Sequence, residues 1–155
     1  MPDTYSQIYI QVVFAVKHRE ALIQPEWENE LYKYITGIVQ NKGQKMLSIN
    51  GTKDHIHFLL GMKPNCCLSD LVREIKKSST SFIREKLNVK YAFQWQEGFG
   101  AFSYSHSQLS EVIKYIESQK EHHRIKTFRE EYMSFLKEFE IQFKNEYLFH
   151  WLDEK

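Results

Sequence analysis

The fold is decided by residues 53–60, which read Lys53-Asp54-His55-Ile56-His57-Phe58-Leu59-Leu60. Side chains of a β-strand point alternately to its two faces. Ile56, Phe58 and Leu60 therefore share one face as an apolar stripe, while His55 and His57 share the other. The stretch predicts a strand that supplies part of the core and also carries two imidazoles that can bind a metal ion.

Hydrophobic periodicity predicts further elements on both sides of this strand. Alternation of apolar and polar residues predicts strands, and two of them are close enough around Gly51-Thr52-Lys53 to pair as a hairpin. Apolar residues three and four positions apart predict helices between them. The predicted order is strand, helix, strand, strand, helix, strand, over residues 5–16, 25–43, 46–50, 54–62, 68–83 and 101–104.

This order predicts an α+β fold of the ferredoxin-like (split βαβ) type, an antiparallel sheet with two helices on one face. An additional C-terminal helix, from about Gln108 to His122, carries Tyr115. A further helix starts at Thr127, which forms a capping box with Glu130. These two helices can cover the open face. The aromatic run 147–152 is too apolar for a free tail, so we expect it to pack, on this chain or on another subunit.

The composition is that of one globular domain spanning residues 1–155, with 42% hydrophobic and 26% charged residues. The net charge is only +1, so affinity for nucleic acid has to come from local clusters of Lys and Arg. The only cysteines, Cys66 and Cys67, are adjacent, which fits a reducing compartment. Since no signal-peptide or membrane-helix pattern is present, we expect a cytoplasmic protein without membrane contact.

Tyr115 and Gln119 lie four residues apart and so share one line on the tyrosine-bearing helix. If that helix covers the histidine face, the amide oxygen of Gln119 can complete a metal site with His55 and His57. Such a mixed nitrogen and oxygen site suits Mn²⁺ or Mg²⁺, which can polarise a phosphoryl oxygen. A phenol near that ion can attack a DNA phosphodiester and store the bond as a phosphotyrosine link.

Three motifs in this order resemble the IS200/IS605-type transposases with a single catalytic tyrosine. They are His55-Ile56-His57, the run Trp95-Gln96-x-Gly98-Phe99-Gly100-Ala101-Phe102-Ser103, and Tyr115-Ile116-x-x-Gln119. The resemblance implies a metal-dependent endonuclease and strand transferase acting on single-stranded DNA. In that family pattern Tyr115 is the nucleophile, and His55, His57 and Gln119 are metal ligands. It also implies a homodimer that binds DNA hairpins and completes its active sites in trans.

A basic face on the second helix is a candidate DNA contact, because Lys and Arg neutralise phosphates. Its members are Arg73, Lys76, Lys77 and Arg84. The same residues are also typical of a solvated helix face.

Three other functions remain open. A domesticated or inactive relative would bind hairpins without cutting them. A nucleotide hydrolase of the histidine triad type also uses a His-hydrophobe-His strand, but it needs a third histidine where this chain has Leu59. A zinc hydrolase would use Cys66 or Cys67, with no motif in support.

Overall fold

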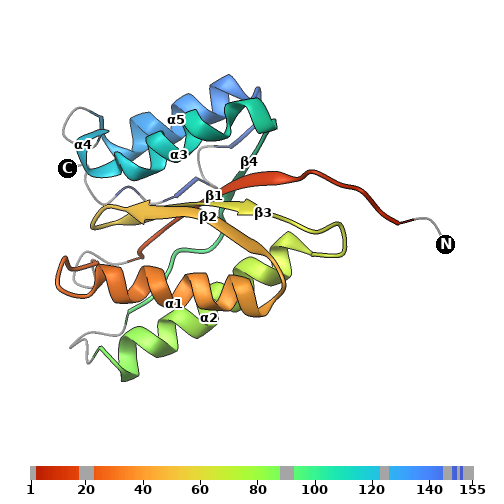
Figure 1. The fold of residues 1–155 in the computed structure, drawn as a ribbon. Coiled ribbons are helices and arrows are strands. Elements are labelled where there is room, and N and C mark those ends of the chain that lie inside the picture. Colours follow the sequence, from red (N-terminus) through yellow and green to blue (C-terminus); the bar gives the residue numbers. More distant parts are fainter. Residues whose placement is uncertain are drawn as a thin grey trace.

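The computed structural model describes residues 3–17, 23–87, 93–122, 126–144, 148–149 and 151. A four-stranded sheet forms its middle layer (Figure 1). The first six elements follow the predicted order: β1 (Tyr9–Ala15), α1 (Glu28–Asn41), β2 (Lys45–Gly51), β3 (His55–Gly61), α2 (Leu68–Glu85) and β4 (Gly100–Tyr104). After them come the short 3-10 helix η2 (His106–Gln108), α3 (Leu109–Glu117), α4 (Gln119–His122) and α5 (Phe128–Glu138).

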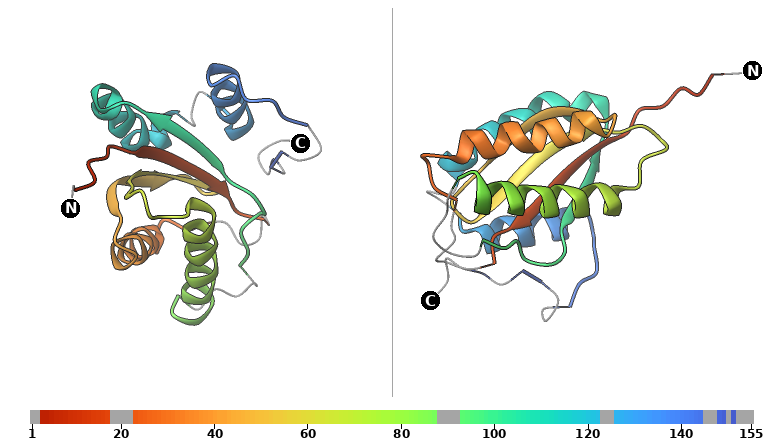
Figure 2. Two further views of the ribbon diagram at one scale, coloured as in Figure 1. Left: turned by 90° about the vertical axis from the view of Figure 1, so that its right-hand side faces the viewer. Right: turned by 90° about the horizontal axis from the view of Figure 1, so that it is seen from below.

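The sheet has the spatial order β2-β3-β1-β4, and every neighbouring pair is antiparallel. Val13 of β1 stands opposite both His57 of β3 and Gly100 of β4. Helices α1 and α2 lie on one face, and α3 and α5 lie on the other (Figures 1 and 2). The predicted ferredoxin-like α+β fold is confirmed, and the later helices cover the face that α1 and α2 leave open, as the sequence analysis allowed.

The face of the sheet toward α1 and α2 is packed with apolar side chains. Phe14 of β1 and Phe58 of β3 are fully buried, with ring centroids 5.8 Å apart in an edge-to-face arrangement. Trp95 packs against Phe14 in the same manner at 4.8 Å. Fully burying one such side chain stabilises the fold by roughly 1.5–3 kcal/mol. The apolar stripe predicted for β3 is confirmed.

The hairpin of β2 and β3 turns immediately before the first histidine. The backbone N–H of Thr52 donates to the carbonyl oxygen of His55 over 3.0 Å. A Cβ atom on Gly51 would collide with that same carbonyl oxygen, so the close approach of the two strands requires glycine. The tight turn fixes His55 at the first position of β3.

Two elements differ most from the prediction. β1 begins at Tyr9, while Tyr5 precedes it with 88% of its surface exposed. The single helix predicted for 108–122 is divided, because Ser118 leaves the helical region with φ −99° and ψ 17°. α3 ends just before Ser118 and α4 begins just after it, at Gln119.

Helix α5 begins where the capping box predicted. The Thr127 hydroxyl accepts from the backbone N–H of Glu130 over 3.2 Å, and the Glu130 carboxylate accepts from the N–H of Thr127 over 3.3 Å. Phe149 and Trp151 pack against Phe128 of α5, with centroids 5.8 and 5.4 Å from its ring. These parts of the aromatic run 147–152 therefore pack on their own chain. Outside the described residues lie Tyr147, His150 and Leu152.

Among the helices in the described ranges, none combines the length and the apolar character that crossing a membrane requires.

Candidate active site

Both histidines of β3 are fully buried and face α3 and α5. Their ring centroids are 5.2 Å apart, and the ring planes meet at 72°. His55 and His57 thus share one face of the strand, as the sequence predicted.

Each imidazole is held from behind by an oxygen acceptor. Asp54 Oδ1 lies 2.7 Å from Nδ1 of His55, and Gln11 Oε1 lies 2.7 Å from Nδ1 of His57. Gln11 in turn donates through Nε2 to the Tyr104 hydroxyl over 2.8 Å. Because carboxylate and amide oxygens only accept, each Nδ1 carries a proton and each Nε2 faces the site. Partners of this kind orient histidines that bind metals.

Tyr115 of α3 and Gln119 of α4 reach the same place. The half-buried ring of Tyr115 has its centroid 5.9 Å from that of His57. Gln119 is fully buried, with Oε1 3.4 Å from Nε2 of His55. The structure therefore brings together, within a single chain, the four residues that the resemblance implied. Completion of the site in trans by a homodimer stays a prediction.

Glu131 of α5 occupies the centre of the site and is only 3% exposed. Its Oε1 lies 2.8 Å from Nε2 of His57 and 3.4 Å from Nε2 of His55. Its Oε2 accepts from the Tyr115 hydroxyl, and also from Nε2 of Gln119 over 3.3 Å. One carboxylate thus joins both histidines to the tyrosine.

Glu131 was not among the site residues predicted from the sequence, although a signal was present. Glu131 stands three residues after Phe128 and four before Phe135, both buried, and so lies on the apolar stripe of α5. A carboxylate on a buried stripe needs a partner, because an unpaired charge is costly to bury. The pattern predicts that Glu131 has a partner but does not show which residue it is. Only the fold identifies His55 and His57 as the partners.

The charges in the site act on two titrating groups. Burial alone lowers the pKa of His55, but hydrogen bonds to Asp54 and Glu131, with the charges of both, outweigh it and raise the pKa to about 9. Burial raises the pKa of Tyr115, the nearby charge of Glu131 raises it further, and Gln119 opposes the shift. The phenol is protonated at neutral pH, so it must lose that proton as it becomes a nucleophile.

His55, His57 and Glu131 form a group that can hold a metal ion. One ligand atom from each lies within 4.8 Å of the other two. Two imidazole nitrogens and a carboxylate oxygen are a donor set that divalent transition metals accept. The described residues contain no second such group, and neither Cys66 nor Cys67 belongs to it.

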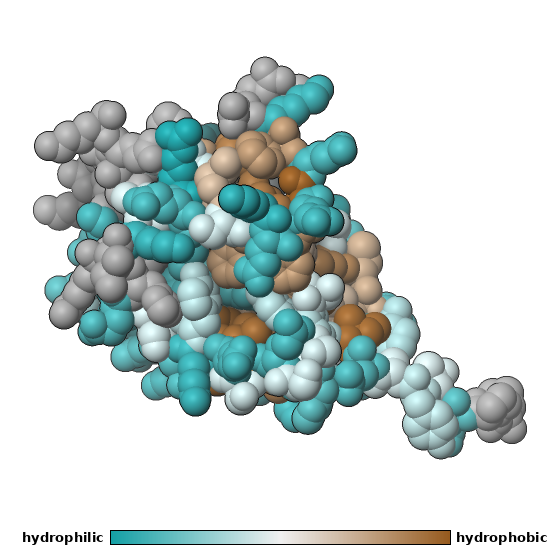
Figure 3. Space-filling view, turned by 90° about the horizontal axis from the view of Figure 1, so that it is seen from above, coloured by the Kyte–Doolittle hydropathy of each residue, from teal (hydrophilic) through white to brown (hydrophobic). Residues whose placement is uncertain are grey.

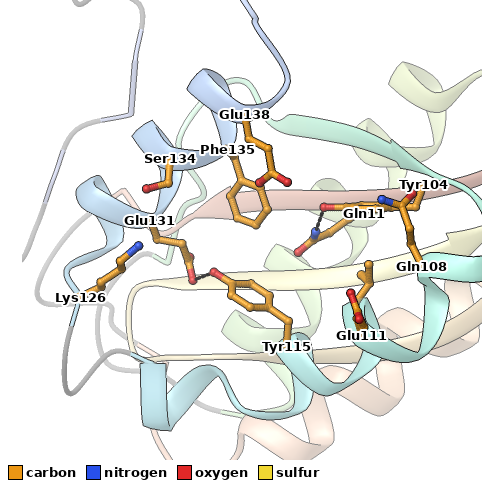
Figure 4. Close-up of a pocket in the computed structure, with 11 residues that line it drawn as sticks. Gln11, Tyr104, Gln108, Glu111, Tyr115, Lys126, Glu131, Ser134, Phe135 and Glu138 are labelled. Atoms are coloured by element: carbon orange, nitrogen blue, oxygen red, sulfur yellow. Dashed lines mark hydrogen bonds between the residues drawn. The ribbon is translucent and has the colours of Figure 1, made fainter.

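Aromatic rings and a cavity surround the group. The Phe128 ring stacks on His55 with centroids 3.9 Å apart, and Phe135 meets Tyr115 edge to face at 5.7 Å. A cavity of about 330 Å³ begins at Tyr115 and Glu131 and runs between α3 and α5 (Figure 4). Figure 3 looks onto these helices and shows apolar surface in hollows between hydrophilic side chains.

The basic residues of α2 lie on the far side of the sheet from this site (Figure 1). Lys76 donates through Nζ to the carbonyl oxygens of Gln96 and Gly98 over 2.8 and 2.6 Å. Arg84 donates twice to the carbonyl oxygen of Phe93. These two side chains therefore anchor the segment before β4. The other two members of the basic face, Arg73 and Lys77, are exposed.

Fold and site together define a class of protein. A ferredoxin-like sheet with paired histidines on a central strand, faced by a tyrosine and an amide from a later helix, is the arrangement expected of a single-tyrosine transposase. The sequence matches the family model described as transposase IS200 like over residues 4–119. The chain belongs to this family of DNA-processing enzymes. Glu131 lies beyond the matched residues.

The known proteins of similar sequence or structure are also described as transposases. The ISDra2 transposase TnpA of Deinococcus radiodurans is 23% identical over 118 residues, covering 73% of this chain and 84% of that protein. A crystal structure from Deinococcus radiodurans R1, described as a transposase, matches with a TM-score of 0.61 at 19% identity, covering 77% of this chain and 95% of the other. A REP-associated tyrosine transposase bound to a REP hairpin matches with a TM-score of 0.57 at 16% identity, covering 76% and 70%. The two structures share the fold.

Proposed function

We propose that this protein is a metal-dependent transposase that cuts and rejoins single-stranded DNA through a covalent 5′-phosphotyrosine intermediate. The observation that carries the proposal is the meeting of Tyr115 with the paired histidines around one buried carboxylate. Membership of the IS200-like transposase family supports it. The DNA hairpin bound by the REP-associated relative supports a hairpin-bearing substrate.

His55, His57 and Glu131 would hold the ion, with the amide oxygen of Gln119 as a fourth ligand. Of the two metals that the sequence suggested, Mn²⁺ suits this set better, because Mg²⁺ strongly prefers oxygen ligands. When bound, the ion supplies polarisation of a phosphoryl oxygen and charge stabilisation in the transition state.

Tyr115 would act as the nucleophile. Its oxygen forms a bond to phosphorus as the bond from phosphorus to the 3′ oxygen breaks, and the released strand leaves with a 3′-hydroxyl after taking up a proton from water. The phenol proton already lies in a hydrogen bond to Glu131, which is the acceptor at hand. The reverse reaction on a second 3′-hydroxyl rejoins DNA without ATP, since the phosphotyrosine link conserves the bond.

The exposed basic residues of α2 would contact the DNA hairpin away from the cutting site. Arg73 and Lys77 line one pocket together with Lys76 and Arg84. Arg73 pairs with Asp70 through a contact that is largely exposed, so solvent screens it and phosphate can replace it. We expect these contacts to be felt as salt-dependent affinity.

The experiment is adduct formation. The protein is incubated with Mn²⁺ and a labelled single strand carrying the terminal hairpin of its own element, and covalent complexes are separated in detergent. We expect an adduct that Tyr115→Phe abolishes and that Tyr132→Phe retains, because the Tyr132 ring packs against Phe128 and Phe149 and its hydroxyl lies beside Gly100.

An undiminished adduct in Tyr115→Phe would show that another residue is the nucleophile. Tight hairpin binding by the wild type, with no adduct in any divalent metal, would instead support the non-cleaving relative.

A further inference from the structure

The cavity beside Tyr115 has the size and position of a subsite for a single nucleobase. Its volume of about 330 Å³ is at the lower end of the range for small-ligand pockets. It lies between α3 and α5, with Tyr115 and Glu131 in its wall (Figure 4). A phosphate held at the Tyr115 hydroxyl places its neighbouring base within reach of this space.

Aromatic side chains line the cavity and suit the flat face of a base. Phe135 and the rings of Tyr104 and Tyr115 contribute to its wall. Phe135 is buried, and its ring is fixed against Phe102 with centroids 4.9 Å apart. Stacking on rings of this kind is a common way to hold unpaired bases, and it works for every base.

A buried polar pair adds a donor at the inner end of the cavity. Gln11 has no exposed surface, and both ends of its amide are engaged, one by His57 and the other by Tyr104. The Tyr104 hydroxyl accepts the bond from Gln11, so its own proton can be donated to a ligand. Burial raises the pKa of Tyr104 to about 12, which keeps that proton in place at neutral pH.

The mouth of the cavity carries mainly negative charge. Glu111 of α3 and Glu138 of α5 are exposed there, and Lys126 is the single cation among the described residues that line the cavity. The carboxylates of Glu111 and Glu138, which lie outside the metal group, disfavour a phosphate at the mouth and present acceptor oxygens to a neutral ring. Carboxylates accept hydrogen bonds from the exocyclic amino group of a base such as cytosine, whereas thymine has a carbonyl oxygen at the same ring position.

We propose that this cavity binds the nucleobase that flanks the cleaved phosphate and selects a base with an exocyclic amino group over thymine. The inference rests on the proposed function for its place in the reaction. The base preference is inferred from the residues that line the cavity alone. The base-binding inference and the proposed function can therefore fail separately.

The test uses a single strand with the element's terminal hairpin and randomised bases on both sides of the cleaved bond. Sequencing both fragments after cutting in Mn²⁺ should show, at one flanking position, amino-bearing bases preferred over thymine by roughly fivefold or more. Glu138→Gln adds a donor that thymine can use and should reduce this preference. Glu117→Gln, an exposed substitution on α3 outside the cavity, should keep it.

A second measurement is independent of cleavage. Titration with deoxycytidine and with thymidine, followed by the NMR signals of the cavity tyrosines, should shift those signals with deoxycytidine at concentrations where thymidine has little effect.

The outcomes separate the two hypotheses. Normal cutting with no base preference at either flank overturns the subsite and leaves the proposed function standing. A strand that is never cut overturns the proposed function, and the nucleoside titration then decides on the cavity by itself. Equal shifts with both nucleosides overturn the selectivity.

Discussion

The two faces of the sheet differ in function: one forms the apolar core, and the other carries the polar site. Toward α1 and α2, β1 and β3 present Phe14 and Phe58 in a purely apolar contact. Toward α3 and α5, the intervening positions of the same strands present Gln11, His55 and His57, all fully buried. Because side chains alternate between the two faces of a strand, one stretch of backbone can carry both the stabilising core and a polar site.

The polar face depends on complete pairing. Each of these three polar side chains has a partner: Asp54 and Gln119 for His55, Glu131 for His57, and Tyr104 for Gln11. A buried polar group that loses its partner costs about 1–3 kcal/mol, which is why such networks need a stable sheet beneath them.

The largest loss of stability is expected from a substitution on the apolar face. Phe14→Ala should lower the free energy of unfolding by about 3–5 kcal/mol, because it removes a ring that contacts both Phe58 and Trp95. Urea denaturation measures the loss. Phe14→Leu refills most of the volume and should cost clearly less; equal losses would mean that packing at this position does not set stability.

The second prediction concerns Glu131, at the centre of the polar face. Glu131→Gln should weaken Mn²⁺ binding by at least the roughly 10- to 100-fold that is typical when a residue supporting the ligands is changed, because Glu131 is proposed as a ligand itself. Titration calorimetry measures the affinity. Glu138→Gln, on the same helix but outside the metal group, is the matched control. An affinity unchanged by Glu131→Gln would exclude this carboxylate as a ligand.

A third substitution tests whether the polar face depends on hydrogen bonding where the apolar face depends on size. Gln11→Leu keeps the side chain's approximate size but leaves Nδ1 of His57 without its acceptor, so we expect a loss of about 1–3 kcal/mol in the free energy of unfolding. Val12→Leu, at the next position on the opposite face, tests whether size alone matters there. A stabilised Gln11→Leu protein would mean that this hydrogen bond is not needed.

The smallest effect concerns how firmly α5 is held. Thr127→Ala removes the capping hydroxyl and should cost about 1 kcal/mol. Thr127→Ser preserves the cap and is the control. Thermal unfolding followed by circular dichroism measures both, and indistinguishable midpoints would show that the cap is unimportant.

The sequence predicted what local patterns encode. Alternation in 54–62 gave β3 and the shared face of its histidines, and the capping box gave the start of α5. Glu131 was missed because its partners are 74 and 76 positions away and no local pattern names them. For Lys76 the sequence leaves open a phosphate contact or a solvated side chain, because a helix pattern cannot show that the carbonyl oxygens of Gln96 and Gly98 lie within its reach. Its DNA role stays a prediction.

The hydrogen bonds behind the two histidines also suggest a sequence of events during folding. Asp54 is the immediate neighbour of His55, and Thr52 joins the same turn, so this ligand is set as soon as the hairpin closes. Hairpins form within about 1–10 μs. His57 waits for Gln11, 46 residues away, and for Glu131, 74 residues away, and distant contacts form late. Full metal affinity would therefore report that the chain has finished folding.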